Sequence, residues 1–301
     1  MKRTAGLVLM VLASWCIQAK KSPPAVPAYL AAPAEALASP ASRRVALGLF
    51  GHFDDDSTIA GTLNLLVRNG WEVHIAWITT AGGVGGIYGE PEQRMAEAKK
   101  AAAAVGIPPE RQHYLGFPDH GVVDHLPEAV DKVTELVKEV RPSLVITCAY
   151  EGGHTDHDAT PLAVYIARKR LGPEAAGFAH FEIPTYNTSG PKIMPYRMNN
   201  FIKAWGPWEY VRLDRQGYKV RKEVRRAYKS QWFFMAPEGM IGAWRHLFGE
   251  GEPIRALPNY DFTQPPHPGK LLWQRGPGIK TGESFDYWRN AVLALPEFQG
   301  K

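Results

Sequence analysis

Cysteine is scarce in this sequence, which contains only Cys16 and Cys148. If the N-terminal segment is removed, Cys148 stands alone and no intrachain disulfide can form, which excludes a disulfide-stabilised scaffold. Cys148 lies inside an apolar run, so we expect a buried and unreactive thiol there. The composition is otherwise that of an ordinary soluble protein, with 45% hydrophobic and 22% charged residues in the chain of 301.

The apolar run near the N-terminus is too short to span a bilayer, but it has the form of a secretory signal. Lys2 and Arg3 precede the apolar core Gly6 to Trp15, and Ala19 offers a small residue for cleavage. We therefore expect residues 1–19 to be a signal peptide and the protein to be exported, to the periplasm or the cell exterior. A retained membrane anchor is the less favoured alternative.

An excess of charge of one sign is also lacking once the N-terminal region is set aside. The formal net charge is +5, but residues 1–22 contain four basic residues and no acidic one, so the rest of the chain carries +1. A surface this close to neutral gives no reason to expect a nucleic-acid partner. The basic run Lys219 to Lys229 is expected to be a solvated helix face, with nucleic-acid or membrane contact as the alternative.

Strand and helix patterns alternate from residue 45 onward, after an Ala- and Pro-rich leader at 20–42. This alternation predicts an α/β fold with a doubly wound, mostly parallel sheet and helices on both faces. No internal repeat is present. The predicted strands are 45–51, 72–79, 112–115, 144–150 and 180–185, and the predicted helices are 57–69, 92–105, 126–140 and 158–171.

The last hundred residues are less regular. A strand at 208–213 and a basic helix at 219–231 are expected, and a Trp-, Pro- and Gly-rich C-terminal extension follows at 233–301. The tryptophans of this region could stack on sugars, but packing of an irregular extension is the favoured interpretation.

Three carboxylates and a histidine follow the first predicted strand directly, in the order His52-Phe53-Asp54-Asp55-Asp56. A spacing of three lets His52 and Asp55 converge on one point while Asp54 points elsewhere, so one carboxylate could bind a metal and its neighbour could act as a base. Acidic residues also cap helix N-termini. Capping explains one or two of these carboxylates, but not three together with a histidine.

A second polar cluster, His154-Thr155-Asp156-His157, follows the fourth predicted strand. The carboxyl ends of parallel strands meet at one edge of a sheet, so the two clusters could face each other across a crevice. Two histidines and one carboxylate with an open position form a catalytic zinc site, and zinc lowers the pKa of its bound water toward about 7.

Other catalytic fingerprints are missing. The helical H-E-x-x-H pattern is absent, and the glycine-rich segment 81–86 lacks the Lys-Ser/Thr of a phosphate loop and follows the second strand instead of the first. A nucleotide-dependent Rossmann enzyme is therefore disfavoured, and we expect 81–89 to be a flexible loop on the substrate side.

The two clusters resemble the A-H-P-D-D-E and H-P-D-H motifs of the LmbE-like (PIG-L) zinc-dependent N-deacetylases. The resemblance extends over 44–232 and includes Arg94-x-x-Glu97, Gly116-Phe117-Pro118-Asp119 and the segment 222–231. It implies a Rossmann-like fold in a domain at 43–232 and hydrolysis of an N-acyl group, commonly acetyl on an N-acetylglucosamine unit.

The resemblance also implies a role for each matching residue. His52, Asp55 and His157 would bind Zn²⁺, and Asp54 would be the base that activates the metal-bound water. His154 would act on the acyl oxygen or the leaving amine as a charged imidazole. Arg94 and Asp119 would lie near the substrate.

This sequence departs from the family pattern at Phe53, where relatives have Pro, and at Asp56, where they have Glu. The glycine-rich segment also lacks an acidic residue often found there. We predict a zinc-dependent deacetylase of an N-acylated amino sugar or glycan fragment. The alternatives are a deacylase of a non-sugar amide and a carbohydrate-binding protein that has lost turnover; the sequence does not indicate an oligomeric state.

Overall fold

The structure is a computed structural model that describes residues 26–28, 30, 44–80, 89–190, 196–233, 236, 240, 251–274 and 284–299. The predicted signal peptide, nearly all of the leader and the glycine-rich segment 81–88 lie outside these residues. Among the described residues, no helix combines the length and apolar character that a membrane crossing requires.

A seven-stranded mixed sheet forms the centre of the molecule, in the order β3-β2-β1-β4-β5-β9-β8. The first five of these strands are parallel, and β9 and β8 are antiparallel to their neighbours. The prediction of a mostly parallel sheet is confirmed. The strands are β1 (Val45–Phe50), β2 (Glu72–Thr79), β3 (Gln112–Phe117), β4 (Leu144–Cys148), β5 (Ala179–Ile183), β8 (Glu209–Val211) and β9 (Glu252–Ala256), and a small hairpin is formed by β6 (Tyr186–Asn187) and β7 (Arg197–Met198).

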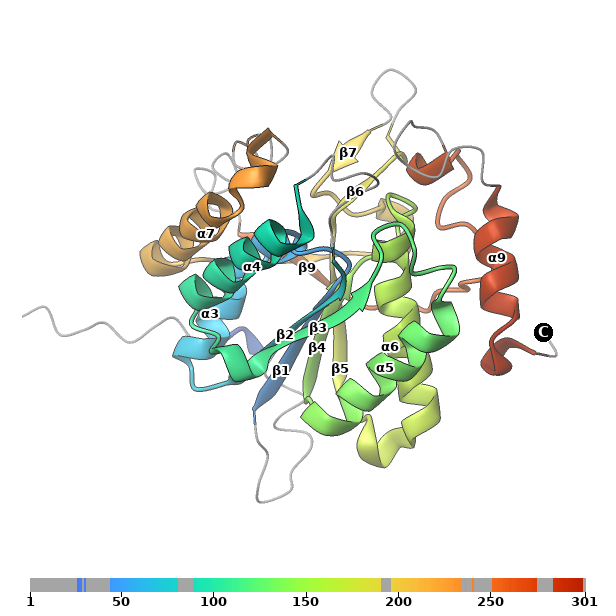
Figure 1. The fold of residues 1–301 in the computed structure, drawn as a ribbon, viewed down its shortest axis with the longest axis horizontal. Coiled ribbons are helices and arrows are strands. Elements are labelled where there is room, and N and C mark those ends of the chain that lie inside the picture. The colour runs from blue at the N-terminus through green and yellow to red at the C-terminus, as the bar shows by residue number, and fades with distance from the viewer. Residues whose placement is uncertain are drawn as a thin grey trace, which may run out of the picture.

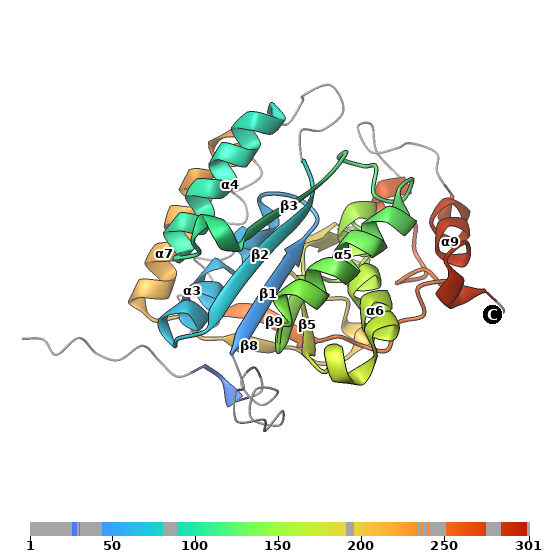
Figure 2. The ribbon, with the colours of Figure 1, turned by 60° about the horizontal axis from the view of Figure 1, so that its bottom comes forward.

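Helices cover both faces of the sheet, as Figures 1 and 2 show. One face carries α3 (Ala60–Arg68), α4 (Pro91–Val105) and α7 (Arg215–Ala227), and the other carries α5 (Leu126–Val140), α6 (Thr155–Ala175) and α9 (Phe285–Leu293). Short 3₁₀ turns are η1 (Asp55–Thr58), η3 (Pro109–Arg111), η4 (Lys203–Trp205), η5 (Lys229–Gln231), η6 (Leu272–Gln274) and η7 (Pro296–Phe298).

The apolar character of the central strands follows from this layering. Every residue of β1 is buried, because alternate side chains enter the two helical layers. Leu47 and Leu49 pack with α5 and α6, whereas Ala46 and Phe50 pack with α3, α4 and α7. A strand buried on both faces is a continuous apolar run in the sequence, which is why this strand was predictable.

Phe53 packs inside the second of these two apolar layers. Its ring lies edge-on to Trp77, with ring centroids 5.6 Å apart, and to Tyr114, at 5.9 Å. The residue is 1% exposed. The aromatic residue that replaces the family's proline therefore stabilises the turn after β1 from the core side.

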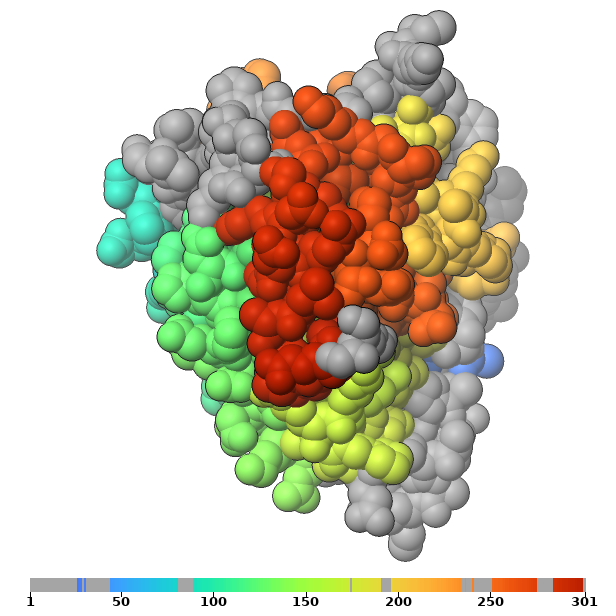
Figure 3. All heavy atoms as spheres, turned by 90° about the vertical axis from the view of Figure 1, so that its right-hand side faces the viewer, coloured from blue at the N-terminus to red at the C-terminus, as the bar shows by residue number. Residues whose placement is uncertain are grey.

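The C-terminal part of the chain is integrated into the same core. β9 pairs with both β5 and β8, and Trp273 and Trp288 are buried in the layer that also contains α5 and α6. Figure 3 shows this segment in orange and red, lying across one side of the molecule beside α5 and α6. The extension that the sequence indicated at 233–301 thus supplies one strand of the main sheet.

Candidate metal and catalytic site

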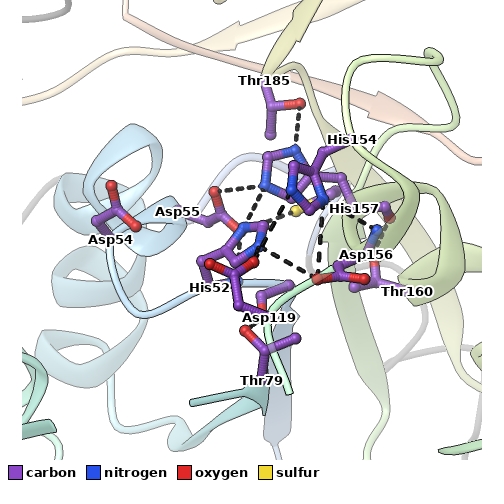
Figure 4. A network of polar contacts seen from close by, with 12 residues as sticks. His52, Asp54, Asp55, Thr79, Asp119, His154, Asp156, His157, Thr160 and Thr185 are labelled. Atoms are coloured by element: carbon purple, nitrogen blue, oxygen red, sulfur yellow. Dashed lines mark hydrogen bonds and ion pairs between the residues drawn. The ribbon is translucent and has the colours of Figure 1, made fainter. Parts of the chain in front are cut away.

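The two polar clusters follow β1 and β4, which are neighbouring parallel strands. Their loops therefore emerge side by side at one edge of the sheet. Gly51 permits the close approach, because a Cβ there would lie 2.8 Å from the ring of His157. Figure 4 shows the side chains of both loops gathered into one polar network.

His52, Asp55 and His157 have ligand atoms that all lie within 4.8 Å of one another. His52 Nδ1 is 2.8 Å from His157 Nε2, and His157 Nε2 is 3.1 Å from Asp55 Oδ1. Two imidazole nitrogens and a carboxylate oxygen that converge in a buried position are the donors that a catalytic Zn²⁺ uses. The structure thus brings together the three residues predicted as ligands, and their chemistry fits the metal.

Electrostatics in this trio favours a deprotonated carboxylate. Burial alone would raise the pKa of Asp55, but the charges of His157 and His52 and their hydrogen bonds lower it to about 2. Burial likewise would lower the pKa of His52, but the carboxylates of Asp119, Asp156 and Asp55 raise it well above its usual value. A bound cation would neutralise the negative charge of these carboxylates, a role that protonated histidines have otherwise.

Further side chains orient the three donors. His157 Nδ1 lies 3.1 Å from Thr185 Oγ1, and His52 Nε2 lies 3.0 Å from Asp119 Oδ1. Hydrogen bonds of this kind fix which ring nitrogen of a histidine is left to bind a metal. The thiol of Cys148 donates to Asp55 Oδ2 at 3.6 Å, so this buried cysteine contacts the site as well as the core.

Asp54 lies beside the trio and outside it. Arg94 Nη2 donates to Asp54 Oδ1 at 2.8 Å, and Figure 4 shows Asp54 to one side of the histidines. The Arg94 side chain is 3% exposed and that of Asp54 is 18% exposed. Arg94 was expected near the substrate; in the structure it binds the residue expected to be the base.

His154 is the residue just before α6 and caps the helix with its own ring, because Nδ1 accepts the backbone N–H of Asp156 at 3.1 Å. Its Nε2 lies 3.3 Å from Nε2 of His120. Burial, followed by the charges of His52, His120 and His157, lowers the pKa of His154 well below its usual value. This favours a neutral imidazole with its proton on Nε2 over the charged form that the resemblance implies.

Asp119 was expected to contact substrate but lies within the cluster. Its carboxylate is 8% exposed, and burial would raise its pKa, but the charges of His52, His154 and His120 lower it well below the usual range. A second group of possible donors overlaps the first at His52 and includes Asp119, His154 and Asp156. We assign Asp119 to the support of His52, since one imidazole nitrogen serves the trio and the other faces this carboxylate.

Asp56, one of the carboxylates that capping could have explained, makes no cap at the turn after β1. The structure records no side-chain cap at η1, and Asp56 Oδ1 accepts a hydrogen bond from the Tyr228 hydroxyl at 2.6 Å. Burial, together with the nearby charges of Asp54 and Asp55, raises the pKa of Asp56 well above its usual value. Its role is to attach the segment after α7 to the turn that carries the site.

The site also contains two residues, Asp156 and His120, to which the sequence gave no role. Asp156 accepts the backbone N–H of His120 at 2.7 Å and that of Val122 at 3.3 Å, which holds the loop after β3 against α6. His120 has a φ of 59°, a left-handed conformation that is unusual for a non-glycine residue. The signal in the sequence that could have identified His120 is its position next to Asp119, which the resemblance had already singled out.

Comparisons with known proteins agree with this geometry. Residues 47–167 match the model of the PIG-L family, which is described as GlcNAc-PI de-N-acetylase. The conserved protein TT1542 from Thermus thermophilus is 24% identical, with a TM-score of 0.54 over 72% of this chain and 96% of that one.

Two solved deacetylases share the fold at lower identity. The zinc inhibited form of teicoplanin deacetylase Orf2 is 14% identical, with a TM-score of 0.53 over 72% of this chain and 100% of the other. N,N'-diacetylchitobiose deacetylase from Pyrococcus horikoshii is 15% identical, with a TM-score of 0.53 over 77% of this chain and 91% of the other.

Proposed function

We propose, from the match of residues 47–167 to the PIG-L family model, that the protein is a metal-dependent hydrolase that removes the N-acetyl group of an amino sugar or glycan fragment. The observation that carries the proposal is the convergence of His52, Asp55 and His157 at the carboxyl edge of the sheet. Amide hydrolysis needs an activated water, a polarised carbonyl and a proton for the amine, and this site has residues for each need.

His52, Asp55 and His157 would hold the metal. A bound Zn²⁺ would supply Lewis acidity toward the acyl oxygen and would lower the pKa of the attacking water. Asp54 takes the proton of that water at a carboxylate oxygen, while Arg94 orients the carboxylate. His154 donates a hydrogen bond from Nε2 to the acyl oxygen or the departing nitrogen, and that nitrogen takes the proton held by Asp54 as the C–N bond breaks.

The proposed substrate class rests on what the similar proteins act on. The family description names a de-N-acetylase of an N-acetylglucosamine lipid, and the two solved deacetylases are named for teicoplanin and diacetylchitobiose. An amide on a sugar ring is common to these names. A deacylase of a non-sugar amide and a sugar-binding protein without turnover are the competing functions, but no observation favours either.

The test is release of acetate from a panel of N-acetylated mono- and disaccharides, together with metal analysis. We expect Asp54→Asn to retain the metal and to lose nearly all turnover, by about a hundredfold or more, because the base is removed while the ligand trio stays. His157→Ala should lose both metal and turnover. Full activity of Asp54→Asn would remove Asp54 from the mechanism.

The identity of the metal needs its own measurement. One of the similar structures is named as a zinc inhibited form, so activity should be followed as zinc is added to the metal-free protein from below one equivalent to a large excess. We expect deacetylase activity to rise until one equivalent of zinc has been added. Activation by another divalent ion, with zinc inhibiting at every ratio, would replace zinc in the proposal.

We also propose that the protein is exported. The support is the basic and apolar pattern of residues 1–19 described above. N-terminal sequencing of the protein purified from its native cells should then begin near residue 20, and recovery of an intact Met1 from the cytoplasm would contradict export.

A further inference from the structure

The outward face of α7 carries a line of basic side chains that continues into η5. The members on α7 are four, three and four residues apart, which is the spacing of one helix face. Its opposite face is buried against the core through Val220 and Val224. The exposed basic residues are Arg215, Lys219, Lys222, Arg226 and Lys229.

Two large aromatic side chains follow this line in the sequence, and more than half of the surface of each is exposed. Trp232 is 67% exposed and Phe233 is 69% exposed, with their rings perpendicular and their centroids 5.9 Å apart. Adjacent tryptophan and phenylalanine at this level of exposure are unusual on a protein that does not dock to an apolar medium. Trp in particular favours the boundary between water and lipid, because its ring has an apolar body and a polar N–H.

The aromatic pair lies at the same edge of the molecule as the candidate metal site. Just before it, Ser230 donates to Glu97 on α4, from its backbone N–H at 3.0 Å and from its hydroxyl at 2.6 Å. One turn earlier on α4, Arg94 contacts Asp54. α4 begins at this carboxyl edge of the sheet, and Figure 1 shows the C-terminal end of α7 beside the start of α4.

We propose that the exposed basic line of α7 and the Trp232-Phe233 pair form a docking face for an anionic lipid bilayer. The basic side chains would lie against the lipid headgroups, and the two aromatic rings would enter the interface. α7 keeps its apolar face in the protein core, so the attraction would come from the cluster of cations and the apolar contribution from the two rings alone. Docking would place the candidate site close to the bilayer surface.

The aromatic pair favours a bilayer over a nucleic-acid duplex. A duplex keeps its bases stacked inside and would be bound by the cations alone, whereas a single strand could stack its bases on the two rings and is therefore a named outcome of the test. The acidic side chains nearby are few: Glu223 on α7 pairs with Lys219 at 3.8 Å, and Glu90 and Glu92 are exposed at the start of α4.

The proposal is tested by co-sedimentation of the full chain with vesicles of phosphatidylcholine, with and without 30% phosphatidylglycerol (about a third of the lipid, enough to give a negative surface potential). We expect binding to the anionic vesicles that weakens with salt. Lys222→Glu should reduce the partition coefficient by about fivefold or more, since one cation near an anionic surface contributes about that factor. Trp232→Ala should reduce binding at high and low salt alike.

Lys138→Glu is the matched control, because Lys138 is exposed on α5, on the other face of the sheet. It should bind vesicles as the unchanged chain does, and the N-terminal segment is the same in all variants. Equal losses in Lys222→Glu and Lys138→Glu would overturn the proposal, as would absence of binding to anionic vesicles. Tighter binding to single-stranded DNA than to anionic vesicles would replace the bilayer by a nucleic acid. Vesicle binding requires no turnover, so its outcome is separate from that of the acetate assay.

Discussion

Asp54 and Arg94 show how a single contact changes the interpretation of two residues. Sequence similarity gave Asp54 the role of base and placed Arg94 near the substrate, whereas the structure joins their side chains at 2.8 Å. An arginine that donates to a carboxylate oxygen fixes the direction of that carboxylate. Arg94 would then act on the reaction through Asp54.

We predict that Arg94→Lys lowers kcat by about ten- to a hundredfold and leaves KM nearly unchanged, because residues that orient a functional group cost about this much when changed. Steady-state kinetics on an N-acetylated sugar measures both constants. A rise in KM with kcat preserved would instead support direct substrate contact by Arg94.

Phe53 is the residue at which this chain departs most visibly from the family motif. We predict that Phe53→Ala lowers the free energy of unfolding by about 3–5 kcal/mol, because it leaves a cavity between Trp77 and Tyr114. Urea denaturation measures the difference. Phe233→Ala, at a side chain 69% exposed, is the control and should change stability by less than about 0.5 kcal/mol; similar losses in the two variants would contradict the packing role.

At the scale of elements, one helix and one strand with a regular apolar pattern were predicted to their ends. α5 spans Leu126–Val140 and β2 spans Glu72–Thr79, both as expected. α6 begins three residues earlier than expected, at Thr155, because the ring of His154 supplies the cap. A histidine cap has no sequence signature, so the start of this helix could not be predicted from the local pattern.

The loop between β4 and α6 depends on a buried carboxylate, Glu151. Its Oε1 accepts the backbone N–H of Ile202 at 3.1 Å. Burial and the charge of Glu182 raise the pKa of Glu151 to about 8, although Arg255 acts in the opposite direction. The hydrogen-bonded side chain thus ties the His154 loop to the segment after β7.

We predict that stability falls as the pH rises from about 4.5 to about 8. The folded protein keeps a proton on Glu151 over this range, while the unfolded chain has released it, so the unfolded state binds fewer protons and gains relative stability with pH. Thermal denaturation at a series of pH values measures this. Glu151→Gln should make the fall of stability with pH less steep. If the variant shows the same fall, the pH dependence belongs to Glu182, whose pKa is also raised, to about 7.

At the scale of the whole molecule, the C-terminal segment completes the sheet. Glu252 in β9 accepts hydrogen bonds from the backbone N–H groups of Gly61 and Thr62, at 3.0 and 2.7 Å, and lies 3.4 Å from Arg221 of α7. These contacts join the start of α3, α7 and the last strand of the chain. The predicted boundary at residue 232 would cut through them.

We predict that a chain ending at residue 232 does not fold cooperatively, because it lacks β9 and the buried rings of Trp273 and Trp288. Circular dichroism and denaturant titration test this, with a chain ending at residue 299 as the control. Cooperative unfolding of the shorter chain would show that 43–232 is an independent domain.

The sequence by itself determined the alternation of strands and helices and the placement of two polar clusters after two strands, because burial on both faces and strand-end loops leave local patterns. It could not determine which side chains face one another, since the contacts of His120 with His154, Arg94 with Asp54 and Tyr228 with Asp56 join residues 34 to 172 positions apart. Such pairings depend on how the layers pack. Only the tertiary structure decided them.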